Sequence, residues 1–281
     1  VSGVIAKIGE AVEGLFVGDR VVFMPQVTCG ECYMCRHGME HICENLKVMG
    51  FQTDGAAQEY FPVDAEKVLK VPDRVSLEQA AMVEPVSVAA HALRRSGIEL
   101  TGKQVLVLGA GTIGLLVAQS AKALGAKAVM ITDINDYKVE KAKVCGADFA
   151  VNTSENDLTE VIVRCFGPQR ADLILECVGA QETITQAVEN ARKGTTIVVV
   201  GVFGEKPIVD LGLVQDRELR LVGTLMYQRR DYEQAIDLMV GGKLCLEQMM
   251  THCFSFKEYR QAYQAIEESE GNYLKVMINL E

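Results

Sequence analysis

The feature that most constrains the fold is an alternation of apolar runs and helical periods that begins at Ser87. The apolar runs cover residues 105–108, 129–132, 149–152, 173–176, 195–200 and 219–223. Segments of helical periodicity separate them, and strands joined by crossover helices run parallel in one sheet. We therefore predict an α/β fold built on a doubly wound, six-stranded parallel sheet.

A glycine-rich turn follows the first apolar run. Gly109, Gly111 and Gly114 fit the pattern G-x-G-x-x-G, with Thr112 and Ile113 at the start of the next helical period. The first glycine allows a tight turn, the second lets the backbone approach a pyrophosphate, and the third allows close packing of helix on strand. The free N–H groups of a helix N-terminus attract phosphate. The sequence therefore predicts a Rossmann domain that binds a dinucleotide.

An acidic residue ends the second apolar run. Asp133 stands nineteen residues after Gly114. A carboxylate there can accept hydrogen bonds from the adenosine ribose hydroxyls and would repel a 2′-phosphate, so we expect NAD rather than NADP. The alternative is that the glycines only end a strand and that Asp133 caps the next helix. Lys138 lies on that helix, either beside the adenosine or as a solvated surface lysine.

Two further strand ends are expected at the same crevice, because ligands of such sheets bind outside the carboxyl ends of the strands. Cys177 and Val178 follow the fourth apolar run, and Gly201, Val202 and Phe203 follow the fifth. The small residues at these ends leave room for a nicotinamide ribose. The alternative at each end is an ordinary turn.

Four of the nine cysteines lie within fifteen residues, spaced C-x2-C-x2-C-x7-C at Cys29, Cys32, Cys35 and Cys43. Four thiolates can close a tetrahedron around Zn²⁺ and leave no position for substrate, so this spacing predicts a structural zinc site. An iron–sulfur cluster and a disulfide knot are the alternatives. The fourth cysteine is later than in the usual ferredoxin run, and the scattered remaining thiols fit a reducing compartment.

Composition sets limits on partners and size. A chain of 281 residues with 49% hydrophobic residues predicts two lobes with separate cores. The formal charge is 28 − 38 = −10, without a basic stripe, which argues against nucleic acid or a membrane surface as partner. Neither a membrane-spanning apolar run nor a leader is evident, so we expect a cytoplasmic protein.

The chain divides into three parts by pattern. Residues 1–86 contain short β-like runs, such as 20–23 and 56–63, and the cysteine-rich insertion. Residues 87–224 form the predicted dinucleotide domain. Residues 225–281 contain helical periods at 232–240 and 257–268 and an apolar run at 276–280. This tail is too short to form its own core, so we expect it to pack on the first part.

The order of these features is similar to that in zinc-containing medium-chain dehydrogenases: a cysteine lobe, then a Glu84-Pro85 pair, then the glycine-rich turn. The segments 82–91 and 223–227 resemble the polyol branch, which includes sorbitol and L-iditol dehydrogenases and relatives acting on threonine or butanediol. The resemblance covers the whole chain. It implies a mostly β, GroES-like catalytic domain beside the Rossmann domain, and a homodimer or homotetramer.

The resemblance also implies an activity: hydride transfer between NAD and a secondary alcohol or polyol, with a catalytic zinc acting as Lewis acid. Glu84 matches an acid of that zinc site, which acts as a ligand or through the metal's water. The alternative is a carboxylate that stabilises a helix start next to Pro85. Leu225 and Met226 match the segment that approaches the nicotinamide. His91 is expected to be a core or interdomain residue.

Two departures from the family pattern bear on this expectation. The other catalytic-zinc ligands, a cysteine and a Gly-His-Glu motif, would precede Val1, so we expect the sequence to be N-terminally incomplete. Met226 stands where animal sorbitol dehydrogenases carry a sugar-binding arginine, which puts sorbitol in question. The alternatives are a non-catalytic NAD- and zinc-binding protein of the same fold, and a zinc-free quinone reductase, a class that generally lacks a cysteine lobe.

Overall fold

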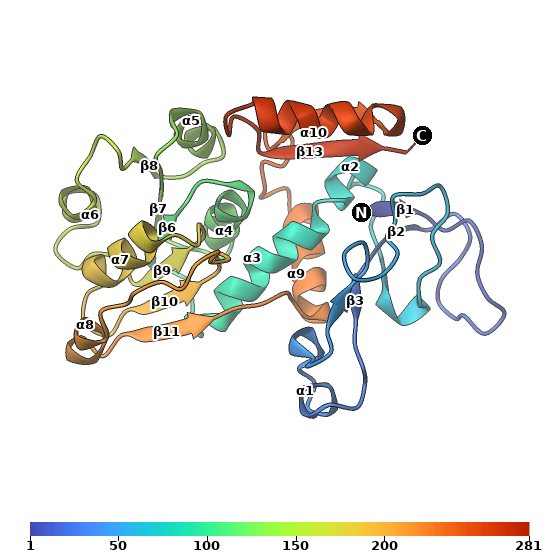
Figure 1. Cartoon of the computed structure of the whole chain (residues 1–281), viewed down its shortest axis with the longest axis horizontal. Coiled ribbons are helices and arrows are strands. Elements are labelled where there is room, and N and C mark those ends of the chain that lie inside the picture. Colours follow the sequence, from blue (N-terminus) through green and yellow to red (C-terminus); the bar gives the residue numbers. More distant parts are fainter. Residues whose placement is uncertain (281) are drawn as a thin grey trace.

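The computed structural model describes residues 1–280 and contains two regions of different architecture (Figure 1). A parallel sheet covered by helices forms one region, and short strands with long loops form the other. Helix α3 (Val83–Arg95) runs between them and passes through the expected boundary at residues 86 and 87.

The parallel sheet has six strands. They are β6 (Gln104–Leu108), β7 (Ala128–Asp133), β8 (Phe149–Asn152), β9 (Leu173–Glu176), β10 (Thr196–Val199) and β11 (Arg220–Gly223). Their order is β11-β10-β9-β6-β7-β8, and every neighbouring pair is parallel. The direction of winding reverses between β6 and β9, which opens a crevice at the carboxyl edge. The predicted doubly wound fold is confirmed.

Helices cover both faces of this sheet. They are α4 (Thr112–Ala123), α5 (Asp136–Val144), α6 (Leu158–Phe166), α7 (Gln181–Asn190) and α8 (Leu211–Asp216). On β6, Val105 and Val107 face one core, whereas Leu106 and Leu108 face the other. A strand buried on both faces needs apolar residues at every position, which explains its uninterrupted apolar run.

The first region is built from short strands. β1 (Ser2–Val4), β2 (Arg20–Phe23) and β5 (Val68–Lys70) form an antiparallel sheet, and β3 (Gln26–Val27) pairs with β4 (Lys47–Val48). Between β3 and β4 lie the cysteines and the short helix α1 (Tyr33–Arg36). The expectation of a β-like run at 56–63 was wrong: this segment forms no strand. Tyr60 there is 74% exposed, so the segment lacks the burial that would fix a strand.

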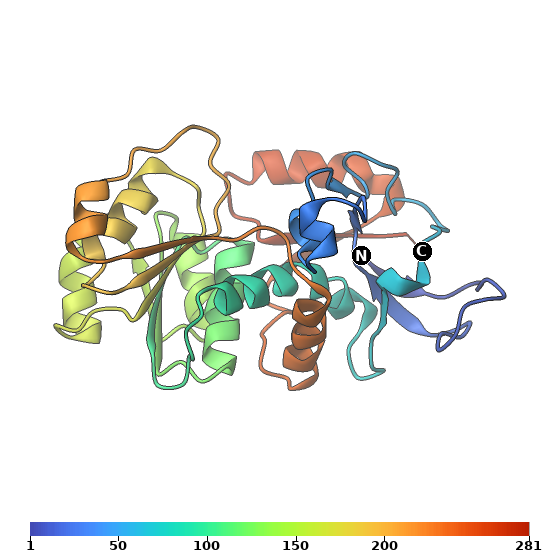
Figure 2. The ribbon, with the colours of Figure 1, turned by 90° about the horizontal axis from the view of Figure 1, so that it is seen from below.

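The C-terminal part contacts both regions. It contains α9 (Arg229–Val240), β12 (Met250–Ser255), α10 (Tyr259–Glu268) and β13 (Lys275–Asn279), while α2 (Leu77–Ala80) precedes α3. Helix α9 packs against α3, and the Tyr232 hydroxyl donates to the Phe23 carbonyl at 3.1 Å. Figure 2 shows α9, in orange, between the parallel sheet on the left and the first region on the right. Strands β12 and β13 pair with each other in parallel.

None of the helices within residues 1–280 is long and apolar enough to cross a membrane.

Candidate functional site

The glycine-rich turn between β6 and α4 leaves no room for side chains at two of its glycines. A β-carbon on Gly109, whose φ is +99°, would lie 2.5 Å from Val178 Cγ2. A β-carbon on Gly114 would lie 1.8 Å from the Gly109 carbonyl oxygen, so α4 packs directly on the turn. The space around Gly111 is open within 4 Å. A ligand can therefore approach the backbone at Gly111, at the N-terminus of α4.

Asp133 lies against the same turn. Its Oδ2 accepts a hydrogen bond from the Ala110 N–H at 2.9 Å, and its Oδ1 accepts from the N–H groups of Ile134 and Asn135. The alternative role as helix cap falls to Asn135, whose side chain accepts from the Lys138 N–H at 3.3 Å. Lys138 itself is half-buried in the first turn of α5. Oδ2, which accepts a single hydrogen bond, retains capacity for another donor.

The strand ends after β9 and β10 touch each other. A β-carbon on Gly201 would lie 2.2 Å from the Gly179 nitrogen, and one on Gly179 would lie 2.4 Å from the Val202 oxygen. Val178 and Val202 remain 47% and 89% exposed, so both offer apolar surface at these strand ends, and Val178 lies beside the glycine-rich turn. Burial raises the pKa of the neighbouring Cys177 thiol, so it stays neutral.

The remaining predicted coenzyme residues lie near this edge in different settings. The Thr112 hydroxyl donates to the Leu274 carbonyl at 2.7 Å, so it joins α4 to the C-terminal part. Ile113 and Phe203 are half-buried. The segment after β11 is tied to the sheet by the Thr224 N–H, which donates to the Val199 carbonyl at 3.3 Å.

Leu225 and Met226 directly follow Thr224. Leu225 is 54% exposed, whereas Met226 is half-buried and has a φ of +52°. A left-handed conformation at a residue with a side chain costs about 1 kcal/mol or more. It turns the chain from the strand end toward Tyr227, which is buried.

Glu84 lies in the first turn of α3 and acts on two buried tyrosines. Burial raises the pKa of Tyr232, and the negative charge of Glu84 raises it further. The pKa of Tyr227 is raised by burial, by the neighbouring Tyr232 and by Glu84. The two tyrosine rings meet edge to face at 5.0 Å. Sequence reasoning did not assign either tyrosine, although Tyr227 ends a segment that it singled out. Their position depends on the contact between α3 and α9.

The donors around Glu84 do not complete a catalytic zinc site. Within residues 1–280, the four cysteines are the sole group of three or more Cys, His, Asp or Glu side chains close enough to share an ion. An open catalytic site needs three protein ligands. Glu84 alone therefore does not fit such an ion.

The four cysteines lie together as the spacing predicted. Their sulfur atoms are all within 4.8 Å of one another, and the shortest pairs are Cys32 with Cys35 and Cys29 with Cys43, both at 3.5 Å. Zn–S bonds of about 2.3 Å require an edge of about 3.8 Å in a tetrahedron. All four thiols are free, so the disulfide alternative is not seen. The donor set fits a closed zinc site.

Backbone N–H groups donate hydrogen bonds to these sulfur atoms. The N–H of Cys32 donates to Cys29 Sγ at 3.4 Å, and that of Cys35 donates to Cys32 Sγ at 3.5 Å. Backbone hydrogen bonds from Cys35 and Glu44 lower the pKa of Cys32 to about 6, whereas burial raises that of Cys35 to about 12. Thiolates are the ligand form, so such donors favour metal binding.

A partly buried polar network joins the cysteine segment to α3 and α9. Gln228 Nε2 donates to the Gly38 carbonyl at 3.0 Å, while its Oε1 accepts from Arg94 at 3.0 Å. Asp231 accepts from His91 at 2.8 Å and from both Nε and Nη2 of Arg94. Burial acts to raise the pKa of Asp231, but the bonds from His91 and Arg94 hold it well below its usual range. His91 is buried, as expected.

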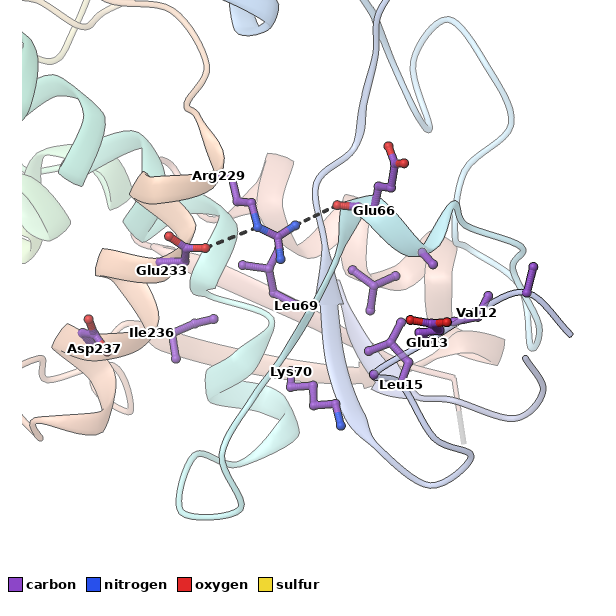
Figure 3. Close-up of a pocket in the computed structure, with 14 residues that line it drawn as sticks. Val12, Glu13, Leu15, Glu66, Leu69, Lys70, Arg229, Glu233, Ile236 and Asp237 are labelled. Atoms are coloured by element: carbon purple, nitrogen blue, oxygen red, sulfur yellow. Dashed lines mark hydrogen bonds and ion pairs between the residues drawn. The ribbon is translucent and has the colours of Figure 1, made fainter. Parts of the chain in front are cut away.

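A separate cleft of about 730 Å³ lies between the first region and α9 (Figure 3). Arg229 projects into it, donating to the Glu66 carbonyl at 2.7 Å and to Glu233 at 3.3 Å. Lys70 on the cleft wall pairs with Asp19 at 2.6 Å. None of the predicted site residues lines this cleft.

Comparison with known proteins places these features in context. Residues 112–241 match the zinc-binding dehydrogenase family, residues 1–73 match the alcohol dehydrogenase GroES-like domain, and residues 48–162 match the NAD-binding domain of D-isomer specific 2-hydroxyacid dehydrogenases.

The chain is similar over most of its length to several named dehydrogenases and a reductase. It is 40% identical to 2-dehydro-3-deoxy-L-galactonate 5-dehydrogenase of Pseudoalteromonas atlantica, over 88% of this chain and 72% of the relative. It is 34% identical to D-xylulose reductase of Saccharomyces cerevisiae, over 99% of this chain and 79% of the relative. A solved short chain alcohol dehydrogenase of Escherichia coli CFT073, complexed with NADH, superposes with a TM-score of 0.91 at 32% identity, over 99% and 82% of the two chains.

Proposed function

The chain belongs to the zinc-binding medium-chain dehydrogenases, and from this premise we propose that it transfers a hydride between NAD and a secondary hydroxyl of a small alcohol or polyol. The observation that carries the proposal is the 2.9 Å hydrogen bond from the Ala110 N–H to Asp133. It brings a ribose acceptor and a pyrophosphate turn together at the point where the sheet reverses its winding. The relatives are named as enzymes that react at hydroxyl-bearing carbons, in agreement with this reaction class.

We assign the two halves of the coenzyme to different strand ends. The adenosine ribose is assigned to Asp133 with Lys138 beside it, and its pyrophosphate to the turn and helix start. The assigned turn residues are Gly109, Gly111, Thr112, Ile113 and Gly114. The nicotinamide half is assigned to the ends of β9, β10 and β11. Those residues are Cys177, Val178, Gly201, Val202, Phe203, Leu225 and Met226.

The negative charge of Asp133 favours NAD over NADP, because a 2′-phosphate would meet a carboxylate that already accepts backbone hydrogen bonds. Bound NAD would supply the hydride acceptor. The chain's own part is to hold the two halves in a fixed geometry, with apolar side chains such as Val178 and Val202 excluding water from the nicotinamide side.

We assign the two metal roles to separate residues. Cys29, Cys32, Cys35 and Cys43 would hold a structural zinc that closes the segment between β3 and β4. Glu84 is assigned to the substrate end of the crevice, where it would be one acid beside a catalytic zinc whose other ligands the described residues do not supply. Its charge acts on Tyr227, which directly follows Met226 of the nicotinamide half.

We further propose three functional parts: a catalytic part at residues 1–86, the NAD-binding domain at 87–224, and a C-terminal segment at 225–281 that returns to the catalytic part. The hydrogen bond from Tyr232 to Phe23 supports that return. A homodimer or homotetramer is proposed because β11 is an open edge of the sheet. A cytoplasmic location is proposed because all nine cysteines are free.

Coenzyme binding and turnover should be measured on the same preparation. The proposal predicts that NADH fluorescence is enhanced and shifted on binding, and that NADH forms when the protein is mixed with NAD and a panel of secondary alcohols and polyols. Binding of neither NADH nor NAD would contradict it.

A second candidate is a protein of this fold that binds NAD and one zinc without turnover. It is favoured by one observation: within residues 1–280, Glu84 lacks partner ligands for a catalytic ion. Metal analysis separates the two. Two zinc ions per chain with turnover support the enzyme, whereas one zinc per chain with NADH binding and no turnover supports the second candidate.

A further inference from the structure

Glu176 is a buried carboxylate that the proposed reaction does not use. It is the last residue of β9, between β6 and β10, and its side chain is fully buried. Its Oε1 accepts hydrogen bonds from the N–H groups of Val178 and Gly179 and from the Thr183 hydroxyl, each at 2.8 Å. Its Oε2 is buried without a hydrogen-bond partner.

The charge of Glu176 has no partner cation. Within residues 1–280, no lysine, arginine or histidine forms an ion pair with it. Burial raises the pKa of Cys177, and the negative charge of Glu176 raises it further. Three donors on one oxygen stabilise a carboxylate, but an unpaired charge in the interior still attracts any cation nearby.

Both turns of the proposed nicotinamide half are in contact with this residue. The Glu176 side chain holds the backbone of residues 178–179, while its carbonyl accepts from the N–H groups of Val200 and Gly201 at 2.8 and 2.9 Å. A β-carbon on Gly201 would lie 2.7 Å from Oε2. The unpaired oxygen therefore lies directly beneath the turn that leads to Val202.

We propose that Glu176 is a positioning residue whose buried charge favours binding of oxidised NAD over NADH. The nicotinamide ring is positively charged in NAD and neutral in NADH, so an unpaired negative charge beneath the two turns attracts the oxidised form selectively. The inference rests on the proposed function, because it requires the nicotinamide to lie against these turns. It gives the crevice a built-in preference for the coenzyme form that oxidises an alcohol.

The test is a comparison of dissociation constants for NAD and NADH in the wild-type protein and in Glu176→Gln. Glutamine keeps an acceptor for the two N–H groups and removes the charge. We expect the ratio Kd(NAD)/Kd(NADH) to rise by about three- to tenfold, as a charge acting through a low-dielectric interior would produce. The rise should persist from about 0.05 M to about 0.5 M salt, because buried charges are weakly screened.

The matched control is Glu205→Gln, which removes the same charge from an exposed position in the segment after β10. The whole protein is acidic, so exposed carboxylates also disfavour the more negative NADH, but salt screens them. In this control the ratio Kd(NAD)/Kd(NADH) should change by less than about twofold at high salt. Thr183→Val removes one donor and keeps the charge, so it should weaken both coenzymes and leave the ratio unchanged.

The outcomes separate this inference from the proposed function. If the wild-type protein binds neither coenzyme, the proposed function fails. If it binds both and a folded Glu176→Gln leaves the ratio unchanged, the inference alone is overturned. Glu176→Ser is a second neutral variant in case glutamine does not fold. If both neutral variants unfold while Glu176→Asp folds, the role of the carboxylate is to stabilise the fold without coenzyme, and the inference is again overturned.

Discussion

At the scale of single residues, Asp133 shows what spacing alone can predict. Its spacing from the glycines in the sequence predicted that it ends the second strand. In the structure its carboxylate accepts a hydrogen bond from the glycine-rich turn. Glu176 and Tyr227 could not be found in this way. The importance of Glu176 comes from three donors and a glycine on neighbouring turns, and that of Tyr227 from packing against α9. Such contacts join residues that carry no shared sequence pattern.

Exchanging Asp133 for arginine should reverse the coenzyme preference. We expect Asp133→Arg to weaken NADH binding by about tenfold and to strengthen NADPH binding, because a hydroxyl acceptor becomes a phosphate partner. Fluorescence titration with both coenzymes measures the change. Glu140→Arg, an equal charge change at an exposed position of α5, should alter neither affinity by more than about twofold. An unchanged preference in Asp133→Arg would remove Asp133 from the site.

Removal of one cysteine of the cluster should release the structural zinc. In Cys32→Ser we expect the zinc content to fall by about one ion per chain and the unfolding temperature to fall by about 5 °C or more, because metal binding stabilises the folded segment. Metal analysis and thermal unfolding measure these changes. Cys253→Ser, at an exposed position in β12, is the control. Full zinc content in Cys32→Ser would refute the assignment.

At the scale of elements, the sequence predicted best where periodicity and burial agree. The four inner strands of the parallel sheet are largely apolar and buried on both faces, so each appears in the sequence as a clear apolar run. The segment 56–63 looked similar but forms no strand, because its residues lack a neighbouring strand and remain largely exposed. The strands of the first region are only two to four residues long, and their existence depends on pairing across distant parts of the chain.

The packing of α4 on the glycine-rich turn can be tested at Gly114. A β-carbon there would lie 1.8 Å from the Gly109 carbonyl oxygen, so the helix must move away from the turn. We expect Gly114→Ala to reduce the free energy of unfolding by about 3 kcal/mol and to weaken NADH binding. Gly111→Ala, where the surrounding space is open, should leave stability within about 1 kcal/mol. Denaturant unfolding and NADH titration measure both; equal stability losses would contradict this packing.

The network between α3 and α9 should make stability depend on acid pH. The pKa of Asp231 is held below its usual value in the folded protein, so its contribution is complete above the unfolded pKa of about 4 and is lost as pH falls through the folded value. We expect the free energy of unfolding to decrease as pH drops below about 4. Asp231→Asn should be less stable at neutral pH and should show a shallower acid dependence. Parallel acid dependence in both proteins would exclude Asp231 as its source.

At the scale of the whole molecule, the doubly wound sheet and the cysteine cluster followed from the sequence, whereas the polar contacts that connect the two regions did not. That connection depends on Arg94 of α3 and on Gln228 and Asp231 at the start of α9, which meet only after folding. The C-terminal part reaches the glycine-rich turn through Leu274 and the first region through Tyr232. The C-terminal part therefore joins the start of α4 to the first region.

The open edge of the parallel sheet gives a prediction about assembly. Leu221 in β11 is 38% exposed, and an unpaired edge strand tends to pair with a symmetry mate. We expect Leu221→Asp to shift the molecular mass in solution toward the monomer, because a charge would be buried in the contact. Light scattering at several concentrations measures it. A wild-type protein that is monomeric at every concentration would contradict the expectation.

The central claim is that a dinucleotide binds across the carboxyl edge of the six-stranded sheet, and a crystal structure of the protein with NADH tests it most directly. The account predicts the diphosphate at the N–H groups of residues 111–113, the adenosine ribose hydroxyls at Asp133, and the nicotinamide beside Val178 and Val202. NADH found in the cleft beside Arg229, or absent from the glycine-rich turn at saturating concentration, would contradict it.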